Sequence, residues 1–199
     1  MRFFATLLLL LATGMSAMAV EEPRYEVVRR FPSFELRRYP DLVVAETEVS
    51  GDRDAASSEG FRRLARYIFG QNRDRRRMTA DEPATEVSRK VAMTAPVLQE
   101  ASAAGWTVRF TMPSSWSIGT LPEPLDGRVR IRELPGRTVA ALRWRGGWSE
   151  ESRQEHERLL LEAMAREGLV AAGPVEWARY DPPWMPWFLK RNELWVAIL

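Results

Sequence analysis

One predicted helix, at residues 54–69, combines an apolar stripe with basic edges. The stripe has the i, i+3, i+4, i+7 spacing of a single helical face and consists of Phe61, Leu64, Ala65 and Ile68. Arg62, Arg63 and Arg66 flank it. A guanidinium can hold a carboxylate through two parallel hydrogen bonds, so this face could bind an apolar ligand that carries carboxylates. The pattern by itself favours a simpler interpretation, a core helix with a solvated basic edge.

A second candidate is the aromatic, proline-rich segment at residues 180–195. It holds three prolines and three tryptophans, together with Met185 and Phe188. Prolines stiffen a loop at little entropic cost, and aromatic rings on a stiff loop could stack on a flat ligand. Composition does not decide between this role and a loop that packs over the end of the fold.

Catalytic and metal-binding chemistry is sparse in this sequence. His156 is the only histidine, and cysteine is absent. Nucleophilic catalysis needs a base beside a nucleophile, and the nearby Ser149 and Ser152 are better explained as helix caps. A zinc site normally needs several His or Cys ligands, and no glycine-rich phosphate loop is present. We therefore expect no catalytic residues, no metal site and a protein that is not an enzyme.

The charge balance argues against nucleic acid as a partner. The chain has 29 basic and 27 acidic residues, a formal net charge of +2, whereas nucleic-acid-binding domains are typically strongly basic. A short basic run contains Arg73, Arg75, Arg76 and Arg77. Acidic residues surround it, so a solvated loop is the favoured interpretation.

The first 19 residues resemble a cleaved secretory signal peptide. Arg2 gives a positive start, residues 3–12 are apolar, and residues 17–19 form a small-x-small cleavage site. The apolar run is much shorter than the ~20 residues that span a bilayer. We expect an exported, periplasmic or secreted protein, monomeric and without stable membrane insertion after cleavage.

Short β-type segments dominate the remaining chain, rich in Val, Thr and aromatics and bounded by Pro and Gly. The predicted strands are residues 25–28, 34–39, 42–49, 87–93, 106–112, 129–134, 138–144, 175–180 and 193–198. The segment at residues 90–97 is interpreted as a buried strand that ends at a proline. A second helix is predicted after Ser149 or Ser152, with Leu160, Ala163 and Met164 as its apolar stripe and Gly168 at its end.

The chain also repeats itself weakly. Residues 34–46 align with residues 129–141 at an offset of 95, and the two predicted helices align at the same offset. We therefore predict a single domain at residues 20–199, made of two similar halves at about 25–113 and 125–199. Each half would contribute antiparallel strands and one helix to a common curved sheet. A cleft between such halves would be a natural ligand site.

Several motifs resemble the SOUL/haem-binding protein family, over about residues 24–198. They are Tyr25-Glu-Val with Arg37-Arg38-Tyr39, the helix end Tyr67-Ile-Phe-Gly-Gln-Asn72, Met93-Thr-Ala-Pro-Val97, Tyr180-Asp-Pro-Pro183 and Arg191-Asn-Glu-Leu-Trp195. The resemblance implies an α+β fold, a twisted antiparallel β-barrel of two similar halves, each with one helix packed on the sheet. It also implies non-catalytic binding of haem or another tetrapyrrole in a shallow apolar cleft.

Carried onto this chain, the family's cleft would have Phe61, Ala65 and Arg66 on one wall and Trp184 and Met185 on the other. Arg66 would meet a haem propionate. Two departures matter. Arg38 stands where one branch has a histidine proposed as an iron ligand, and Met185 stands where another has a propionate-facing lysine. We therefore expect binding without a strong axial ligand.

The alternative is a general module for flat apolar molecules that binds haem incidentally. The same fold is similar to that of bacterial drug-binding regulatory domains, which keeps this second interpretation open.

Overall fold

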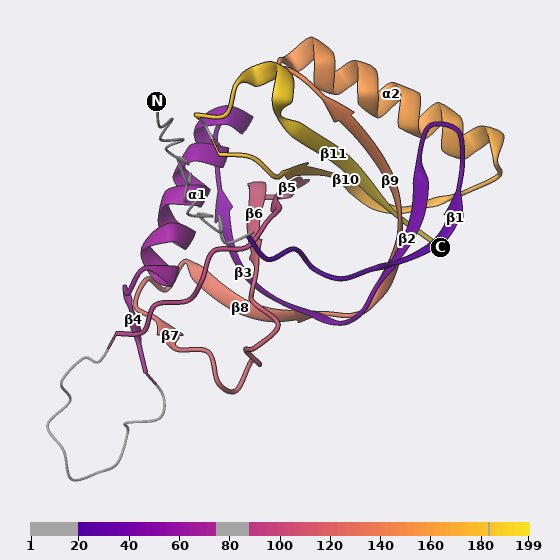
Figure 1. Ribbon diagram of the computed structural model, residues 1–199. Coiled ribbons are helices and arrows are strands. Elements are labelled where there is room, and N and C mark those ends of the chain that lie inside the picture. Colours follow the sequence, from indigo (N-terminus) through magenta and orange to yellow (C-terminus); the bar gives the residue numbers. More distant parts are fainter. Residues whose placement is uncertain (1–19, 75–87, 183) are drawn as a thin grey trace, which may run out of the picture.

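The computed structural model describes residues 20–74, 88–182 and 184–199 (Figure 1). The elements in chain order are β1 (Glu26–Arg30), β2 (Glu35–Tyr39), β3 (Leu42–Val49), α1 (Arg53–Ile68), β4 (Asn72–Arg73), β5 (Val97–Ser102), β6 (Gly105–Thr111), β7 (Glu123–Pro124), β8 (Val129–Leu134), β9 (Arg137–Arg145), α2 (Glu150–Arg166), β10 (Ala171–Arg179), the short 3₁₀ helix η2 (Trp187–Leu189) and β11 (Arg191–Ile198).

Nine of the strands form one antiparallel sheet in the order β1-β2-β9-β11-β10-β5-β6-β3-β8. The sheet curls strongly, with α1 and α2 on its outer side (Figure 1). Strands β1 and β8 are its two edges and do not pair with each other, so the curl is a half-barrel. The predicted α+β class, with two helices packed on a curled antiparallel sheet, is confirmed.

The strand order has an approximate two-fold symmetry about the central β5–β10 pair. The offset of 95 residues relates β2 to β8 and β3 to β9, and the β2–β9 register repeats as the β8–β3 register. Leu36 faces Ala140 in the first pairing, for example, and the equivalent positions Ile131 and Ala45 face each other in the second. The register is thus the one that a duplicated unit would produce. The exact limits of the two halves stay an interpretation.

Each helix covers one half of the sheet and leaves the centre open. α1 packs on β3, β6 and β8, and α2 packs on β9 and β11. Leu64 and Ile68 of α1 enter a cluster with Val108 and Phe110. The α2 cluster contains Leu36, Ala140, Leu142, Leu160, Ala163, Met164 and Leu194, which confirms the predicted stripe of α2. The strands between the two helices therefore have no helix directly above them.

Side-chain caps fix where both helices begin. The carboxylate of Asp52 accepts hydrogen bonds from the backbone N–H groups of Asp54 and Ala55, at 3.1 and 3.0 Å. In α2 the Ser149 hydroxyl accepts from the Ser152 N–H at 3.2 Å. Such bonds satisfy donors that the first turn leaves unpaired. Asp52 thus caps α1, and Ser149 is the cap of α2 of the two predicted serines.

One strand prediction is wrong. Within the described part of residues 87–93 there is no strand, and the strand of this region is β5, which begins at Val97. Val91 is buried with the α1 cluster, but its N–H bonds the Ile68 carbonyl at the end of α1. The apolar residues of this segment thus serve the core from a loop. Apolar runs predict burial better than they predict sheet pairing.

Some predictions fall on residues that the structure does not describe. The proposed signal peptide, residues 1–19, and most of the basic run, residues 75–77, lie outside the described residues. In the described part of the chain, no helix is both long enough and apolar enough to cross a bilayer.

Candidate functional site

A cleft lies along the exposed face of α1 and contains three of the predicted site residues. We call it the α1 cleft. It encloses about 490 Å³ and is lined by Phe61, Arg62, Ala65, Arg66, Phe69, Gly70, Gln71 and Ser88. Phe61 is 38% exposed and its ring packs edge-on against the buried Phe110, with centroids 5.4 Å apart. The core therefore holds Phe61 in place while part of its ring stays open to a ligand.

The charged side chains that line the α1 cleft, among the described residues, are both positive. Arg62 and Arg66 line it, and no carboxylate does among the residues that the structure describes. The guanidinium of Arg62 is 2.7 Å from the Glu59 carboxylate, whereas Arg66 has no ion-pair partner within the described residues. An unpaired guanidinium beside exposed phenyl rings suits a ligand with an apolar body and an anionic group.

The aromatic loop, residues 181–190, presents its rings to solvent. Trp184 is 83% exposed, Trp187 67% and Phe188 57%. The loop is anchored at its base, where Asp181 accepts a hydrogen bond from the Arg191 N–H and Arg145 donates to the Leu189 carbonyl at 3.1 Å. The exposure of these rings disfavours the interpretation of a loop that packs over the end of the fold. Trp184 and Met185 do not line the α1 cleft, so the structure brings only one of the two predicted walls to it.

Arg38 lies in the other half of the sheet from the α1 cleft. It is on β2, and four strands lie between β2 and the β6 strand that α1 covers. Its guanidinium is 3.3 Å from the Glu26 carboxylate and its side chain is 59% exposed. The residue at the position of the family's proposed iron ligand is thus engaged with a neighbouring strand.

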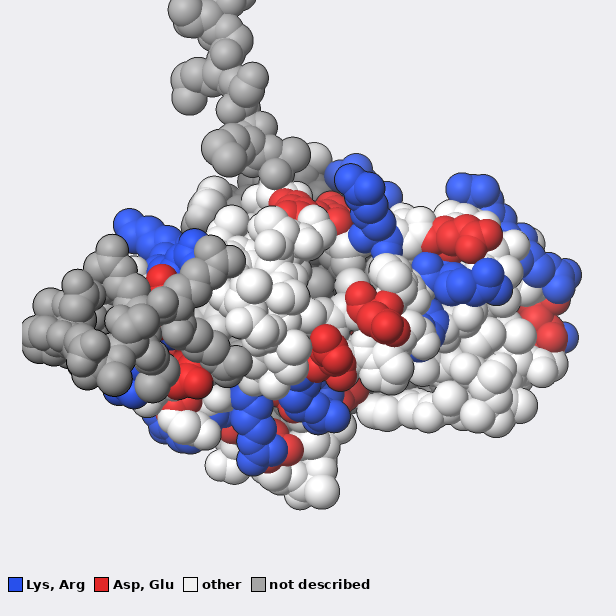
Figure 2. Space-filling view, turned by 90° about the horizontal axis from the view of Figure 1, so that it is seen from below, with Lys and Arg blue, Asp and Glu red and all other residues white. Residues whose placement is uncertain are grey.

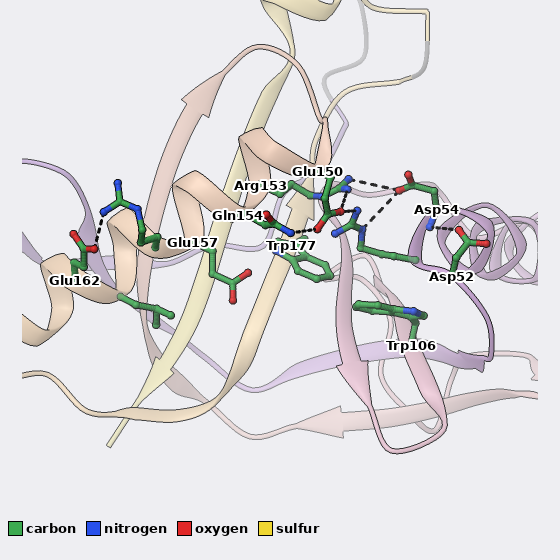
Figure 3. A pocket seen from close by; sticks show the side chains of 12 residues that line it. Asp52, Asp54, Trp106, Glu150, Arg153, Gln154, Glu157, Glu162 and Trp177 are labelled. Atoms are coloured by element: carbon green, nitrogen blue, oxygen red, sulfur yellow. Dashed lines mark hydrogen bonds and ion pairs between the residues drawn. The ribbon is translucent and has the colours of Figure 1, made fainter.

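A second cleft lies between the two helices, at the junction of the two halves where the duplication led us to expect one, although its lining residues were not predicted (Figure 3). We call it the interhelical cleft. It encloses about 900 Å³ above the uncovered centre of the sheet. Trp106 of β6 and Trp177 of β10 form an apolar floor, with ring centroids 5.3 Å apart. These tryptophans are 71 positions apart in the printed sequence, and only the sheet pairing brings them together.

Ion pairs at one end of this cleft join the two helices. Glu150 of α2 binds Arg53 of α1 and also Arg153, the latter at 2.6 Å. Arg153 also lies 3.5 Å from the Asp54 carboxylate. Further along α2, Arg158 binds Glu162 at 2.6 Å. These pairs neutralise most of the charges that line the cleft.

Glu157 is the exception among the lining carboxylates. It projects from α2 beside Trp177 (Figure 3), and no hydrogen bond or ion pair to it is found among the described residues. Burial raises the pKa of the Glu157 carboxyl, and the nearby Glu150 carboxylate raises it further. Both effects disfavour its charged form, so a cation bound beside Glu157 would relieve them.

The lone histidine is packed and hydrogen-bonded away from both clefts. The ring of His156 stacks on Trp144 with centroids 4.3 Å apart, and its Nδ1 lies 2.5 Å from the Ser152 carbonyl oxygen. Among the described residues, no three His, Asp or Glu side chains form a group that could hold a metal ion.

Comparison with known proteins identifies the family. The sequence profile described as SOUL heme-binding protein matches residues 20–197. The chain belongs to the SOUL heme-binding protein family. Among curated relatives it is 28% identical to human Heme-binding protein 2 over 198 residues, covering 93% of this chain and 89% of that protein. It is 26% identical to Heme-binding protein 1 of Xenopus laevis, covering 82% of each chain.

Solved structures resemble this chain in fold. The EcmrR C-terminal domain superposes with a TM-score of 0.56 at 10% identity, over 88% of this chain and 98% of that one. A structure described as a hydrolase from Listeria innocua superposes with a TM-score of 0.51 at 15% identity, over 82% of this SOUL family chain and 91% of its own. At such low identities these likenesses establish the fold alone.

Proposed function

We propose that this protein binds haem or a related tetrapyrrole on the outer face of α1, without catalysing a reaction. The observation that carries the proposal is the unpaired Arg66 beside the exposed rings of Phe61 and Phe69, in a cleft whose described lining residues include no carboxylate. A tetrapyrrole with propionates combines a large apolar body with anionic groups. The α1 cleft offers a complementary surface to both parts.

The residues of the α1 cleft suit the apolar ring and the propionates of haem. They are less suited to binding its iron. Among the described residues that line the α1 cleft there is no histidine, methionine or tyrosine. His156 is held against Trp144, and Met93 packs against the α1 core cluster. We therefore propose binding through burial and propionate pairing, without a strong axial ligand.

The aromatic loop would supply the second wall in this proposal. Trp184 and Met185 are the residues that the family resemblance assigns there. The loop follows Arg179, whose guanidinium donates to the Ser57 hydroxyl of α1 at 3.3 Å, so the base of the loop is next to that helix. Exposed indole rings on a loop whose base lies beside α1 support a role in covering a flat ligand.

The surface supports a small molecule as the ligand. On the face shown in Figure 2, Lys and Arg are interspersed with Asp and Glu, whereas a nucleic-acid footprint is a continuous basic patch. We further propose that the protein is exported to the periplasm or outside the cell, as its first 19 residues suggest, and that it acts there as a monomer.

An absorbance titration tests the proposal. Purified protein is titrated in parallel with haemin and with metal-free protoporphyrin. We expect saturable one-to-one binding of both with similar affinity, because iron ligation contributes little. A sharp, shifted Soret band with haemin alone would overturn binding without an axial ligand.

Variants locate the site in the same assay. We expect Arg66→Glu to lower the affinity for both ligands by at least about tenfold, since a charge-assisted hydrogen bond contributes roughly 1.5–3 kcal/mol. Phe61→Asp should weaken them at least as much. Arg158→Glu on α2 is the matched control and should change neither affinity. Unchanged affinity in both α1 variants would place the ligand elsewhere and favour the general small-molecule module.

A further inference from the structure

The interhelical cleft has the construction of a binding site that the proposed haem function does not use. Its floor consists of Trp177, which is buried in the core, and Trp106. The indole N–H of Trp106 donates a hydrogen bond to the Gly51 carbonyl at 3.1 Å. Gln99, beside Trp177 in the sheet, donates to the Arg53 carbonyl at 2.9 Å and fixes the start of α1. The walls and floor are therefore held by the fold itself.

The charge of this cleft is opposite to that of the α1 cleft. Five carboxylates and three guanidiniums line it: Asp52, Asp54, Glu150, Glu157 and Glu162, against Arg53, Arg153 and Arg158. The arginines pair with Asp54, Glu150 and Glu162, and Asp52 is used as the cap of α1. Glu157 remains as a half-buried carboxylate beside an indole floor.

The floor already accommodates a delocalised cation. The guanidinium carbon of Arg53 lies 5.0 Å from the centroid of the Trp177 ring, within the range of cation–π attraction. The lining also contains the partly exposed Leu161, which adds apolar surface on the α2 side. An indole floor, an aliphatic wall and one unneutralised carboxylate are complementary to a flat ring system with a positive charge.

We propose that the interhelical cleft is a second ligand site, selective for flat aromatic cations, with Glu157 as the counter-ion, the partly exposed Trp106 as the stacking surface and the buried Trp177 packed against it as support. Tetrapyrrole propionates would meet its surplus of carboxylates and be repelled. A neutral ring would gain the apolar contact but leave Glu157 without a partner. Selection by charge is therefore the property that distinguishes this site.

Three probes with one ring skeleton test charge selection. N-methylacridinium is the cation, acridine at pH 8 the neutral analogue and acridine-9-carboxylate the anion. Binding is followed by quenching of tryptophan fluorescence and by the thermal midpoint of unfolding. We expect the cation to bind about tenfold more tightly than the neutral ring and the anion to bind least. Equal affinity for the three probes would overturn the proposal.

Variants then identify the counter-ion. Glu157→Gln should lower the affinity for the cation by about tenfold and leave the affinity for acridine unchanged. The matched control Glu151→Gln, on the same helix but outside the cleft, should change neither affinity. Leu161→Lys, at an exposed position, should also lower the affinity for the cation, and it provides the test if Glu157→Gln fails to fold. Phe61→Asp in the α1 cleft should have no effect, so failure of the haem proposal would leave this one standing. Undiminished cation binding in the Glu157 and Leu161 variants would overturn it.

Discussion

At the scale of single residues, the inner face of the curled sheet is the part of the molecule with the greatest concentration of buried charge. The Glu193 side chain is fully buried, and its carboxylate accepts hydrogen bonds from Arg37 at 2.7 Å, Trp195 at 2.8 Å, Arg191 at 2.9 Å and Tyr180 at 3.0 Å. Burial by itself would raise the pKa of Glu193. The charge of Arg37, the indole of Trp195 and the charge of Arg191 outweigh it, so the pKa lies below its ordinary value.

We expect Glu193→Gln to lower the free energy of unfolding at pH 7 by about 3 kcal/mol, because it leaves buried guanidiniums without a counter-charge. A carboxyl with a depressed pKa stabilises the fold above its unfolded pKa of about 4.3, and this contribution is lost as the pH falls through the folded pKa. The difference between wild type and variant should therefore shrink below about pH 4. Urea unfolding at pH 7 and pH 3.5 measures it. Glu35→Gln, which removes a more exposed partner of Arg37, should cost less, and a pH-independent difference would contradict the assignment.

At the scale of elements, the seating of α1 on β6 depends on a glycine. A Cβ added at Gly60 would lie 2.5 Å from Cγ2 of Val108, and Val108 is fully buried. A short branched side chain inside a packed core cannot swing aside, so any larger residue must push the helix away from the strand.

We expect Gly60→Ala to destabilise the protein by roughly 1–3 kcal/mol, the usual cost of overpacking. Helix propensity acts in the opposite direction, by up to about 1 kcal/mol in favour of alanine, so the sign of the measured change distinguishes the two effects. Chemical denaturation gives the free energy, and Ser58→Ala on the exposed side of α1 should be nearly neutral. Recovery of stability in the Gly60→Ala, Val108→Ala double variant would confirm the steric cause, and a more stable Gly60→Ala protein would contradict it.

Most elements could be predicted because their signals are local. Residues 42–49 and 129–134 coincide with β3 and β8, and both helices were found from apolar spacing and caps. The strand at Val97–Ser102 was missed because its sequence alternates weakly, and its place between β6 and β10 depends on pairing with distant residues. Val91 shows the converse, since a buried apolar residue need not belong to a strand.

At the scale of the whole molecule, the part of the site that lies on one element could be predicted, whereas the part that depends on how distant segments assemble could not. Helical spacing places Phe61 and Ala65 on one apolar stripe with Arg66 at its edge, whereas the choice of these three as a ligand wall came from the family resemblance. The position of Trp184 and Met185 relative to α1 depends on how a loop folds back, which no local pattern specifies. The interhelical cleft requires both halves of the sheet, because its floor lies where β10 and β6 approach the symmetry centre.

The two clefts share α1 but no lining residue, and they have opposite charge. We therefore expect haemin and N-methylacridinium to bind together, each with an affinity that the other changes by less than twofold. For independent sites the stabilisation is additive, about 2.7 kcal/mol for each ligand at a hundredfold excess over its dissociation constant. Urea unfolding with one ligand, the other and both measures this sum. Protein-free mixtures correct for direct association of the anionic porphyrin with the cation. Competition between the ligands would show that they occupy a single site, whereas a reciprocal change in both affinities without competition would reveal that α1 couples the two clefts.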